Sequence, residues 1–150
     1  MSLEQEIKQT RPFKSISEKT LVNIMFTNNW IHFKHNKYLK PFEISIQQYN
    51  VLRILNGQIG QPITINEIID RMLDKMSNAS RLVDKLFAKG YVRREQKAGN
   101  RRACDVTITP KGISFLADVT KSINGIEKDM NTLSEAEFEE LNRLLDKIRK

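Results

Sequence analysis

The chain has 150 residues, of which 39% are hydrophobic and 29% are charged, and its 25 Lys and Arg against 18 Asp and Glu give a formal net charge of +7. This length fits one domain with a substantial core, or one domain with extra helices for contacts between subunits. No apolar run approaches the roughly 20 residues that a membrane helix needs, and the N-terminal segment lacks the apolar core of a signal peptide, so we expect no membrane span and no export. The single cysteine, Cys104, excludes an internal disulfide and a cysteine-rich metal cluster, and it fits a reducing cytoplasm.

The first part of the chain has apolar residues at helical spacing. This spacing predicts a helix over 17–38, and Pro41 ends that helix or stops it from resuming. Ser45 and Gln48 have the spacing of a capping box, in which two side chains bond reciprocally to backbone amides at the start of a helix. They predict a second helix that begins at Ser45.

A second capping box leads into the most basic part of the chain. Thr64 and Glu67 predict a short third helix. A turn near 73–76 follows, and then a fourth helix over 77–89. Gly90 has the usual position of a glycine that ends a helix.

After Gly90 the pattern changes from a helix to a β-hairpin. The segment 91–96 predicts one strand, 98–101 a tight turn and 103–108 the returning strand. In the returning strand, alternate residues would share one face of the hairpin, and these are Cys104, Val106 and Ile108.

The last third of the chain is again helical. Thr109 and Pro110 start a helix, with Thr as the cap and Pro at the first helical position. Ser134 with Glu137 caps a final helix, and the two helices together carry a nearly continuous apolar stripe over 113–148. We therefore expect a mainly α fold with a small two- or three-stranded β wing.

The excess positive charge is concentrated between residues 71 and 102. This window holds ten basic and three acidic residues, so its net charge equals the +7 of the whole chain. A basic surface of this kind is typical of a protein that binds a polyanion, and double-stranded DNA is the first candidate, although a solvated basic surface would give the same total. The basic residues are Arg71, Lys75, Arg81, Lys85, Lys89, Arg93, Arg94, Lys97, Arg101 and Arg102.

The order helix, turn, helix, strand, turn, strand is that of a winged helix-turn-helix. The helix that starts at Thr64 would brace the helix over 77–89, whose exposed face would enter the major groove of DNA. Hydroxyl, amide and guanidinium groups on this face suit hydrogen bonds to bases and phosphates, and helix N-termini favour phosphate oxygens. From the helix-turn-helix, the side chains that we expect to contact DNA are Thr64, Lys75, Ser77, Asn78, Ser80, Arg81 and Lys85.

The hairpin supplies a second candidate contact with DNA. Arg101 and Arg102 lie at its tip beside Gly99. An arginine on a narrow protrusion can enter the minor groove, where the potential is most negative. Each residue also has a structural alternative: Arg101 as a solvated turn residue, and Arg102 as an ion-pair partner inside the wing.

Three segments of this region resemble the MarR family of bacterial transcriptional regulators. The stretch from Ser77 to Arg94, SNASRLVDKLFAKGYVRR, is similar to the family's recognition helix and the strand after it. Asn100-Arg101-Arg102 resembles the Asp-x-Arg motif of the family's wing, with Asn in place of Asp. The segment 108–112, ITPKG, resembles the LTxxG that follows. The order of the flanking helices agrees too, so the resemblance covers nearly the whole chain.

The resemblance implies a homodimer with interleaved outer helices. A single unit over 1–150 would then comprise a winged-helix DNA-binding region at 45–112 and dimerisation helices at 10–40 and 113–150. The residues themselves favour a partner subunit over a monomeric core, because the first long helix carries apolar residues on more than one face. Two-fold symmetry would place the two recognition helices about 34 Å apart on a pseudo-palindromic operator.

The resemblance further implies a small aromatic effector, bound between the dimer helices and the DNA-binding head. Aromatic side chains serve a core as well as a pocket, so both roles stay open for them. The candidate lining residues are Met25, Phe26, Trp30, Phe33, Tyr38 and Tyr49.

Other kinds of site have weaker support in the sequence. His32 and His35 have no cluster of Cys or carboxylate residues near them, so we predict no metal site and no cofactor. Cys104 fits a small buried side chain better than a redox sensor, because no second cysteine is present to resolve it. No arrangement of catalytic side chains is recognisable, and we expect that the protein is not an enzyme.

These observations lead to one functional expectation and one alternative. The expectation is a cytoplasmic, sequence-specific regulator of transcription that acts as a homodimeric, ligand-responsive repressor on double-stranded DNA. The alternative is a winged-helix interaction module whose basic face binds an acidic protein partner.

Overall fold

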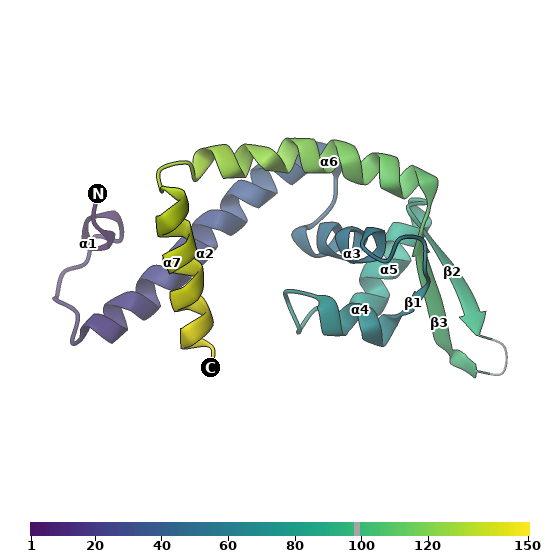
Figure 1. The fold of residues 1–150 in the computed structure, drawn as a ribbon, viewed down its shortest axis with the longest axis horizontal. Helices are drawn as coiled ribbons and strands as arrows, with labels where there is room; N and C mark the ends of the chain where they lie inside the picture. The colour runs from purple at the N-terminus through teal and green to yellow at the C-terminus, as the bar shows by residue number, and fades with distance from the viewer. Residues whose placement is uncertain (98–99) are drawn as a thin grey trace.

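The computed structural model describes the backbone of residues 1–97 and 100–150 and the side chains of 1–96 and 104–150. Within these ranges it confirms a mainly helical fold with a small three-stranded antiparallel sheet (Figure 1). In chain order, the elements are α1 (Leu3–Glu6), α2 (Ile16–Leu39), the short 3-10 helix η1 (Lys40–Phe42), α3 (Ile46–Asn56), β1 (Ile63–Thr64), α4 (Ile65–Arg71), α5 (Ala79–Ala88), β2 (Val92–Lys97), β3 (Asn100–Ile108), α6 (Pro110–Asp129) and α7 (Glu135–Ile148).

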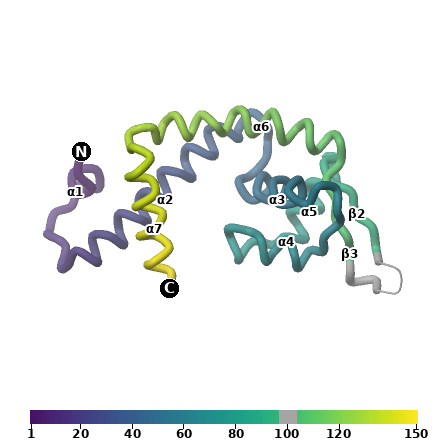
Figure 2. The backbone as a smooth tube through the Cα atoms, in the orientation of Figure 1, coloured from purple at the N-terminus to yellow at the C-terminus, as the bar shows by residue number. Residues whose placement is uncertain are grey.

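Two long helices join a compact head to the end of the molecule that carries both termini. Helices α3, α4 and α5 and the sheet form the head, while α1 and α7 lie at the other end (Figures 1 and 2). Between them, α2 packs against α6: Lys34 Nζ lies 3.0 Å from Asp129 Oδ2, and the Ser122 hydroxyl donates to the Tyr38 carbonyl at 3.1 Å. The Tyr38 ring lies so close to Gly125 that a Cβ there would be 2.7 Å from it. A side chain at residue 125 would therefore require the Tyr38 ring to move.

The predicted helix starts at Ser45, Thr64, Thr109 and Ser134 are confirmed. The Ser45 hydroxyl oxygen accepts from the backbone N–H of Gln48 at 3.1 Å, and the Gln48 side chain accepts from the Ser45 N–H at 2.8 Å. The same reciprocal box begins α4 and α7, and α6 begins with Thr as its cap and Pro at its first turn. Each cap satisfies backbone donors that would otherwise lack partners, which contributes about 1 kcal/mol.

The sheet has the strand order β1-β3-β2, with both pairs antiparallel. Its core-facing residues come from all three strands: Ile63 pairs with Val106, and Val92 pairs with Ile108. Ile63, Val92 and Val106 are buried. The two-residue β1 comes directly before α4, and so it ties the start of that helix to the wing.

One continuous core holds the head together and extends into α6. Its most buried large side chains come from α3, α4, α5, β3 and α6, which contribute Leu52, Ile68, Val83, Val106 and Val119. Burying a Leu, Ile or Val side chain of this kind contributes about 1.5–3 kcal/mol. Helix α5 contacts α3, α4 and β2, so packing against these elements fixes its orientation.

Two predicted boundaries are wrong by two residues or more, and α1, η1 and β1 were not predicted. Helix α5 begins at Ala79 with Asn78 as its cap, not at Ser77, because Ser77 is hydrogen-bonded into the preceding turn by Asp74. Strand β3 begins at Asn100, so the predicted turn over 98–101 is too long at its C-terminal end.

The junction between the head and α6 depends on Gly112. A Cβ at this position would lie 2.1 Å from the Tyr91 carbonyl oxygen and 2.8 Å from the Ile108 side chain. Only glycine lets the first turn of α6 pass this close to the segment that links α5 to β2.

Within the described residues, no helix is both long and apolar enough to cross a membrane.

Candidate nucleic-acid interface

Helix α5 separates its side chains into a buried and an exposed face. Ala79, Val83 and Leu86 are buried in the core, and Leu82 is half-buried. The exposed face carries Ser80, Arg81, Asp84 and Lys85. A helix held by its apolar face and exposing hydroxyl and cationic groups is suited to the major groove of DNA.

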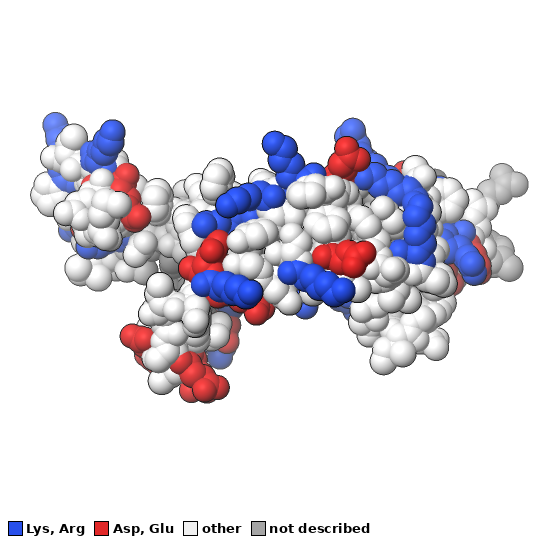
Figure 3. Space-filling view, turned by 90° about the horizontal axis from the view of Figure 1, so that it is seen from above, with Lys and Arg blue, Asp and Glu red and all other residues white. Residues whose placement is uncertain are grey.

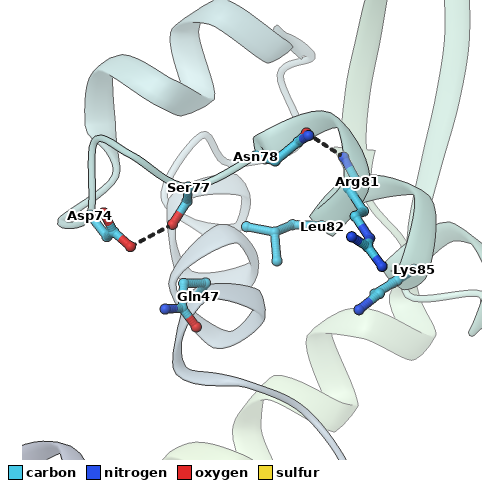
Figure 4. A pocket seen from close by; sticks show the side chains of 7 residues that line it. All are labelled: Gln47, Asp74, Ser77, Asn78, Arg81, Leu82 and Lys85. Carbon is cyan, nitrogen blue, oxygen red and sulfur yellow. Dashed lines mark hydrogen bonds between the residues drawn. The ribbon is translucent and has the colours of Figure 1, made fainter.

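The turn before α5 is organised by Asp74, whose role the sequence analysis missed. One carboxylate oxygen accepts from the Met76 backbone N–H at 3.0 Å, and the other accepts from the Ser77 hydroxyl at 2.9 Å (Figure 4). The Ser77 N–H also donates to the Asp74 carbonyl at 3.3 Å. The Ser77 and Met76 bonds lower the pKa of Asp74, so its carboxylate stays ionised and keeps the turn in one shape. An Asp three residues before a Ser is a signal for such a turn.

The first helical turn of α5 is fixed by Asn78. Its side-chain oxygen accepts from the Arg81 backbone N–H at 3.1 Å. This bond uses the amide oxygen of Asn78, while the amide NH₂ remains a donor. Asn78 therefore caps the helix and can still offer a hydrogen bond outward.

A shallow hollow of about 410 Å³ lies beside α5. In Figure 4, Arg81 and Lys85 border it from α5, Asp74 and Ser77 border it from the turn, and Gln47 borders it from the start of α3. Six of the residues predicted to contact DNA lie within the turn and α5, and four of them line the hollow: Ser77, Asn78, Arg81 and Lys85 line it, whereas Lys75 and Ser80 do not. The structure thus brings most of the predicted helix-turn-helix residues together on one side of the head.

Several basic residues of the 71–102 window bind to the protein itself. The Arg71 guanidinium donates to the Glu67 carbonyl at 2.9 Å, and Lys89 Nζ donates to the Glu43 carbonyl at 2.6 Å. Lys75 Nζ donates to the carbonyls of Ile69 and Asp70 at the end of α4. Arg93 borders a second hollow, on the outer face of the sheet. The positive charge of the window is therefore not confined to the exposed face of α5.

Arg94 and Asp84 connect α5 to β2. Their side chains form an ion pair, and the Arg94 guanidinium lies over the Phe87 ring at 4.4 Å from its centroid. Both charged side chains are partly exposed, so the ion pair contributes at most about 1 kcal/mol. Its importance is geometric, because it holds the wing strand at a fixed angle to α5. This ion pair was not predicted from the sequence, although opposite charges on a helix and on the strand after it were an available signal.

The face of the molecule that α6 forms has a different charge pattern. Seen from above, it carries Lys and Arg interspersed with Asp and Glu (Figure 3). Lys121 pairs with Asp118 on this helix. The charges of α6 itself cancel, since three Lys stand against three Asp and Glu, whereas α5 carries Arg81 and Lys85 against Asp84 alone.

The remaining predicted contacts to DNA are Thr64 and the wing arginines. The Thr64 hydroxyl both accepts from the Glu67 N–H and donates to the Glu67 carboxylate, so it is engaged in the capping box. The backbone of Arg101 and Arg102 belongs to β3, and their side chains lie outside those that the structure describes.

The six candidate effector residues occupy different surroundings. Tyr49 is buried, and its hydroxyl lies 3.5 Å from the Thr120 hydroxyl, whereas the Tyr38 hydroxyl donates at 3.3 Å to Asp129, which lies further along α6. Met25 and Phe33 are largely exposed on α2, Trp30 is 37% exposed, and Phe26 is half-buried. None of the six lines either hollow described above.

The histidines and the cysteine have ordinary surroundings. His35 Nδ1 lies 3.1 Å from the Ile31 carbonyl, and burial is the main cause that lowers the pKa of His35. Cys104 was expected to be buried, but it is only half-buried in β3. Among the described residues, no three His, Cys, Asp or Glu side chains are grouped as metal ligands.

Comparisons with known proteins agree with this architecture. The model of the MarR family matches residues 44–104, from just before α3 into β3. The HTH-type transcriptional regulator TcaR of Staphylococcus aureus (strain Newman) is 31% identical over 110 residues, which cover 71% of this chain and 71% of TcaR. The transcriptional repressor MprA of Escherichia coli (strain K12) is 27% identical over 145 residues, which cover 96% of this chain and 76% of MprA. Both relatives are regulators of transcription.

A solved structure supports the fold over the full length. A mutant of the E. coli regulator MarR, in complex with operator DNA, has a TM-score of 0.74 at 23% identity and covers 99% of both chains. Family match, relatives and fold agree, and this chain belongs to the MarR family.

Proposed function

We propose that this protein is a homodimeric repressor that binds a pseudo-palindromic operator in double-stranded DNA, with the exposed face of α5 in the major groove. The observation that carries this proposal is the position of Arg81 and Lys85 on the exposed face of a helix whose other face is locked into the core. The turn before α5 is fixed by Asp74, so the groups at its N-terminus are held in place before DNA arrives. Preorganisation of this kind lowers the entropic cost of binding.

In the proposed dimer, each chain comprises a winged-helix head at 45–112 and dimerisation helices at 10–40 and 113–150. Large apolar side chains remain exposed along the outer helices of a single chain, namely Leu21, Met25 and Phe33 on α2 and Leu141, Leu144 and Ile148 on α7. Helix α7 buries none of its residues within one chain. A second copy that covers these side chains accounts for an apolar surface that a monomer would leave in water.

The proposed function includes a cytoplasmic location and control by a small aromatic molecule. The family membership supports the location, because such a protein must meet the DNA that it regulates. The aromatic and apolar side chains of α2 supply a surface on which such a molecule can pack, formed when the second subunit is present.

A binding assay with the DNA upstream of the protein's own gene tests the proposal. Fluorescence anisotropy should give saturable binding at low salt, and Arg81→Ala should weaken it by about 1–3 kcal/mol per contact because a charged hydrogen bond to DNA is lost. The matched control is Lys121→Ala, which removes a cation from the mixed face of α6 and should bind as the wild type does.

Two outcomes would contradict the proposal. One is the absence of binding to any duplex at low salt. The other is equal binding by the wild type and Arg81→Ala together with capture of an acidic protein that depends on Arg81, which would favour the interaction module instead.

A further inference from the structure

The turn between α4 and α5 exposes two large apolar side chains to solvent. Met76 is 93% exposed and Leu73 is 87% exposed. Both lie in the head, away from the apolar side chains on α2, α6 and α7 that a second subunit would cover. Nothing within the described part of the chain covers them. Exposure of such apolar surface to water is unfavourable in free energy.

The backbone around Met76 is rigid although its side chain is exposed. The Met76 N–H donates to Asp74 at 3.0 Å, and the Ser77 hydroxyl donates to the same carboxylate. At the start of the turn, the Leu73 N–H donates to the Asn50 side chain of α3 at 3.0 Å. The turn is therefore tied both to itself and to the core helix α3, so it presents Met76 in a defined direction.

Met76 lies among the groups proposed to contact DNA. It is between Lys75 and Ser77 in sequence, two residues before Asn78, the cap of α5. A helix that enters the major groove by its N-terminus brings this position close to the base edges. Leu73 lies at the far end of the turn, next to α4, and so it is further from that N-terminus.

We infer that Met76 is a specificity-determining residue that packs on the 5-methyl group of a thymine in each operator half-site. The thymine methyl is the one apolar group that bases present in the major groove, and it distinguishes thymine from the other three bases there. A methionine side chain is unbranched and adaptable, which suits it to such a small apolar contact. This inference rests on the proposed binding of DNA and adds the base that the turn selects.

Deoxyuridine provides the test, because it differs from thymidine only by the missing methyl group. A duplex of about 30 base pairs is first selected from a random library by the wild-type protein. Each thymine of a half-site is then replaced singly, and binding is followed by fluorescence anisotropy. At one position the wild type should bind about fourfold more weakly, and about sixteenfold when both half-sites are changed, since one buried methyl contributes about that factor.

The Met76→Ala dimer should already bind the thymine duplex about sixteenfold more weakly, for the same reason. Deoxyuridine at the critical position should then have no further effect on it, while changes at other positions still act. Met76→Leu should retain most of the sensitivity to deoxyuridine, because it keeps an apolar side chain. Ile59→Ala is the matched control, since Ile59 is 89% exposed but lies beyond the opposite end of α3.

The possible failures are distinguishable. If the wild type binds its selected duplex and no single deoxyuridine weakens it, or if Met76→Ala is as sensitive as the wild type, the contact with thymine is refuted while the binding of DNA stands. If the wild type selects no duplex at all, the proposed function fails and this inference fails with it.

Discussion

At the scale of single residues, two glycines at helix ends have different tolerances for a side chain. A Cβ at position 112 would meet the Tyr91 carbonyl oxygen at 2.1 Å and the Ile108 side chain at 2.8 Å, whereas a Cβ at position 57 would have its nearest neighbours 3.5 Å away. Gly57 also has a helical φ of −67°. Position 112 therefore requires glycine on steric grounds, and position 57 does not.

Alanine at these two positions gives a matched pair of predictions. Gly112→Ala should lower the free energy of unfolding by about 2–4 kcal/mol, because α6 must move away from the segment that links α5 to β2. Gly57→Ala should leave stability unchanged or raise it by up to about 1 kcal/mol, because it restricts the unfolded chain. Urea unfolding followed by circular dichroism measures both, and equal effects would contradict the close approach at Gly112.

Counting charges over 71–102 identified only part of the candidate interface, because individual basic residues have different partners in the fold. Sequence position places Arg81 and Arg94 in one basic window, but Arg94 pairs with Asp84 and lies over Phe87, while Arg81 borders the hollow beside α5. Which cation is left for a ligand depends on tertiary neighbours that no local pattern contains. Met76 was missed for a related reason, because an apolar residue in a turn has no distinctive spacing.

At the scale of elements, helix starts were predictable and very short elements were not. Capping boxes such as Ser45 with Gln48 are local in sequence, so they could be identified without knowledge of the fold. Strand β1 has two residues and exists only because Ile63 and Thr64 pair with β3, about forty residues later. The start of α5 was misplaced by two residues because Asp74 competes for Ser77.

The N-terminus of α5 allows its stability and its contact with DNA to be separated. Asn78→Ala should cost about 1 kcal/mol of stability, because the cap on the Arg81 N–H is lost. Asn78→Asp should keep the cap and the stability, since Asp is an equally good cap and its charge suits a helix N-terminus. It should nevertheless weaken DNA binding at least about tenfold, because a carboxylate would face phosphate groups. Wild-type affinity of Asn78→Asp would place this helix end away from DNA.

Helix α2 should confer a pH dependence on stability through His35. Burial holds the pKa of His35 below its ordinary value of 6.5, so the folded state binds fewer protons than the unfolded state as the pH falls through that range. The contribution of His35 is therefore fully present at neutral pH and above, and it declines as the pH falls below about 6.5. Urea unfolding at pH 7.5 and 5.5 should show a smaller pH difference for His35→Gln than for the wild type. An identical difference would mean that His35 is as accessible in the folded protein as in the unfolded chain.

At the scale of the whole molecule, the outer helices expose apolar side chains that a second subunit would cover. Leu144 is exposed on α7, which buries none of its own residues. Leu144→Glu should convert the dimer into monomers in sedimentation velocity, because a charge would be placed in an apolar interface. Ile59→Glu, at an equally apolar exposed site on the head, should remain dimeric. A wild-type protein that sediments as a monomer would remove the basis for two half-sites.

In the proposed complex, α5 and the turn before it meet the phosphates and bases of a duplex as parts of a dimer. The most direct measurement is the dissociation constant for the selected duplex as a function of salt concentration. If each subunit neutralises at least about three phosphates, the plot of log Kd against log salt should have a slope of about 5 or more, and Arg81→Ala should reduce that slope by about 2 for the dimer. A slope near zero, or one that Arg81→Ala leaves unchanged, would contradict the account.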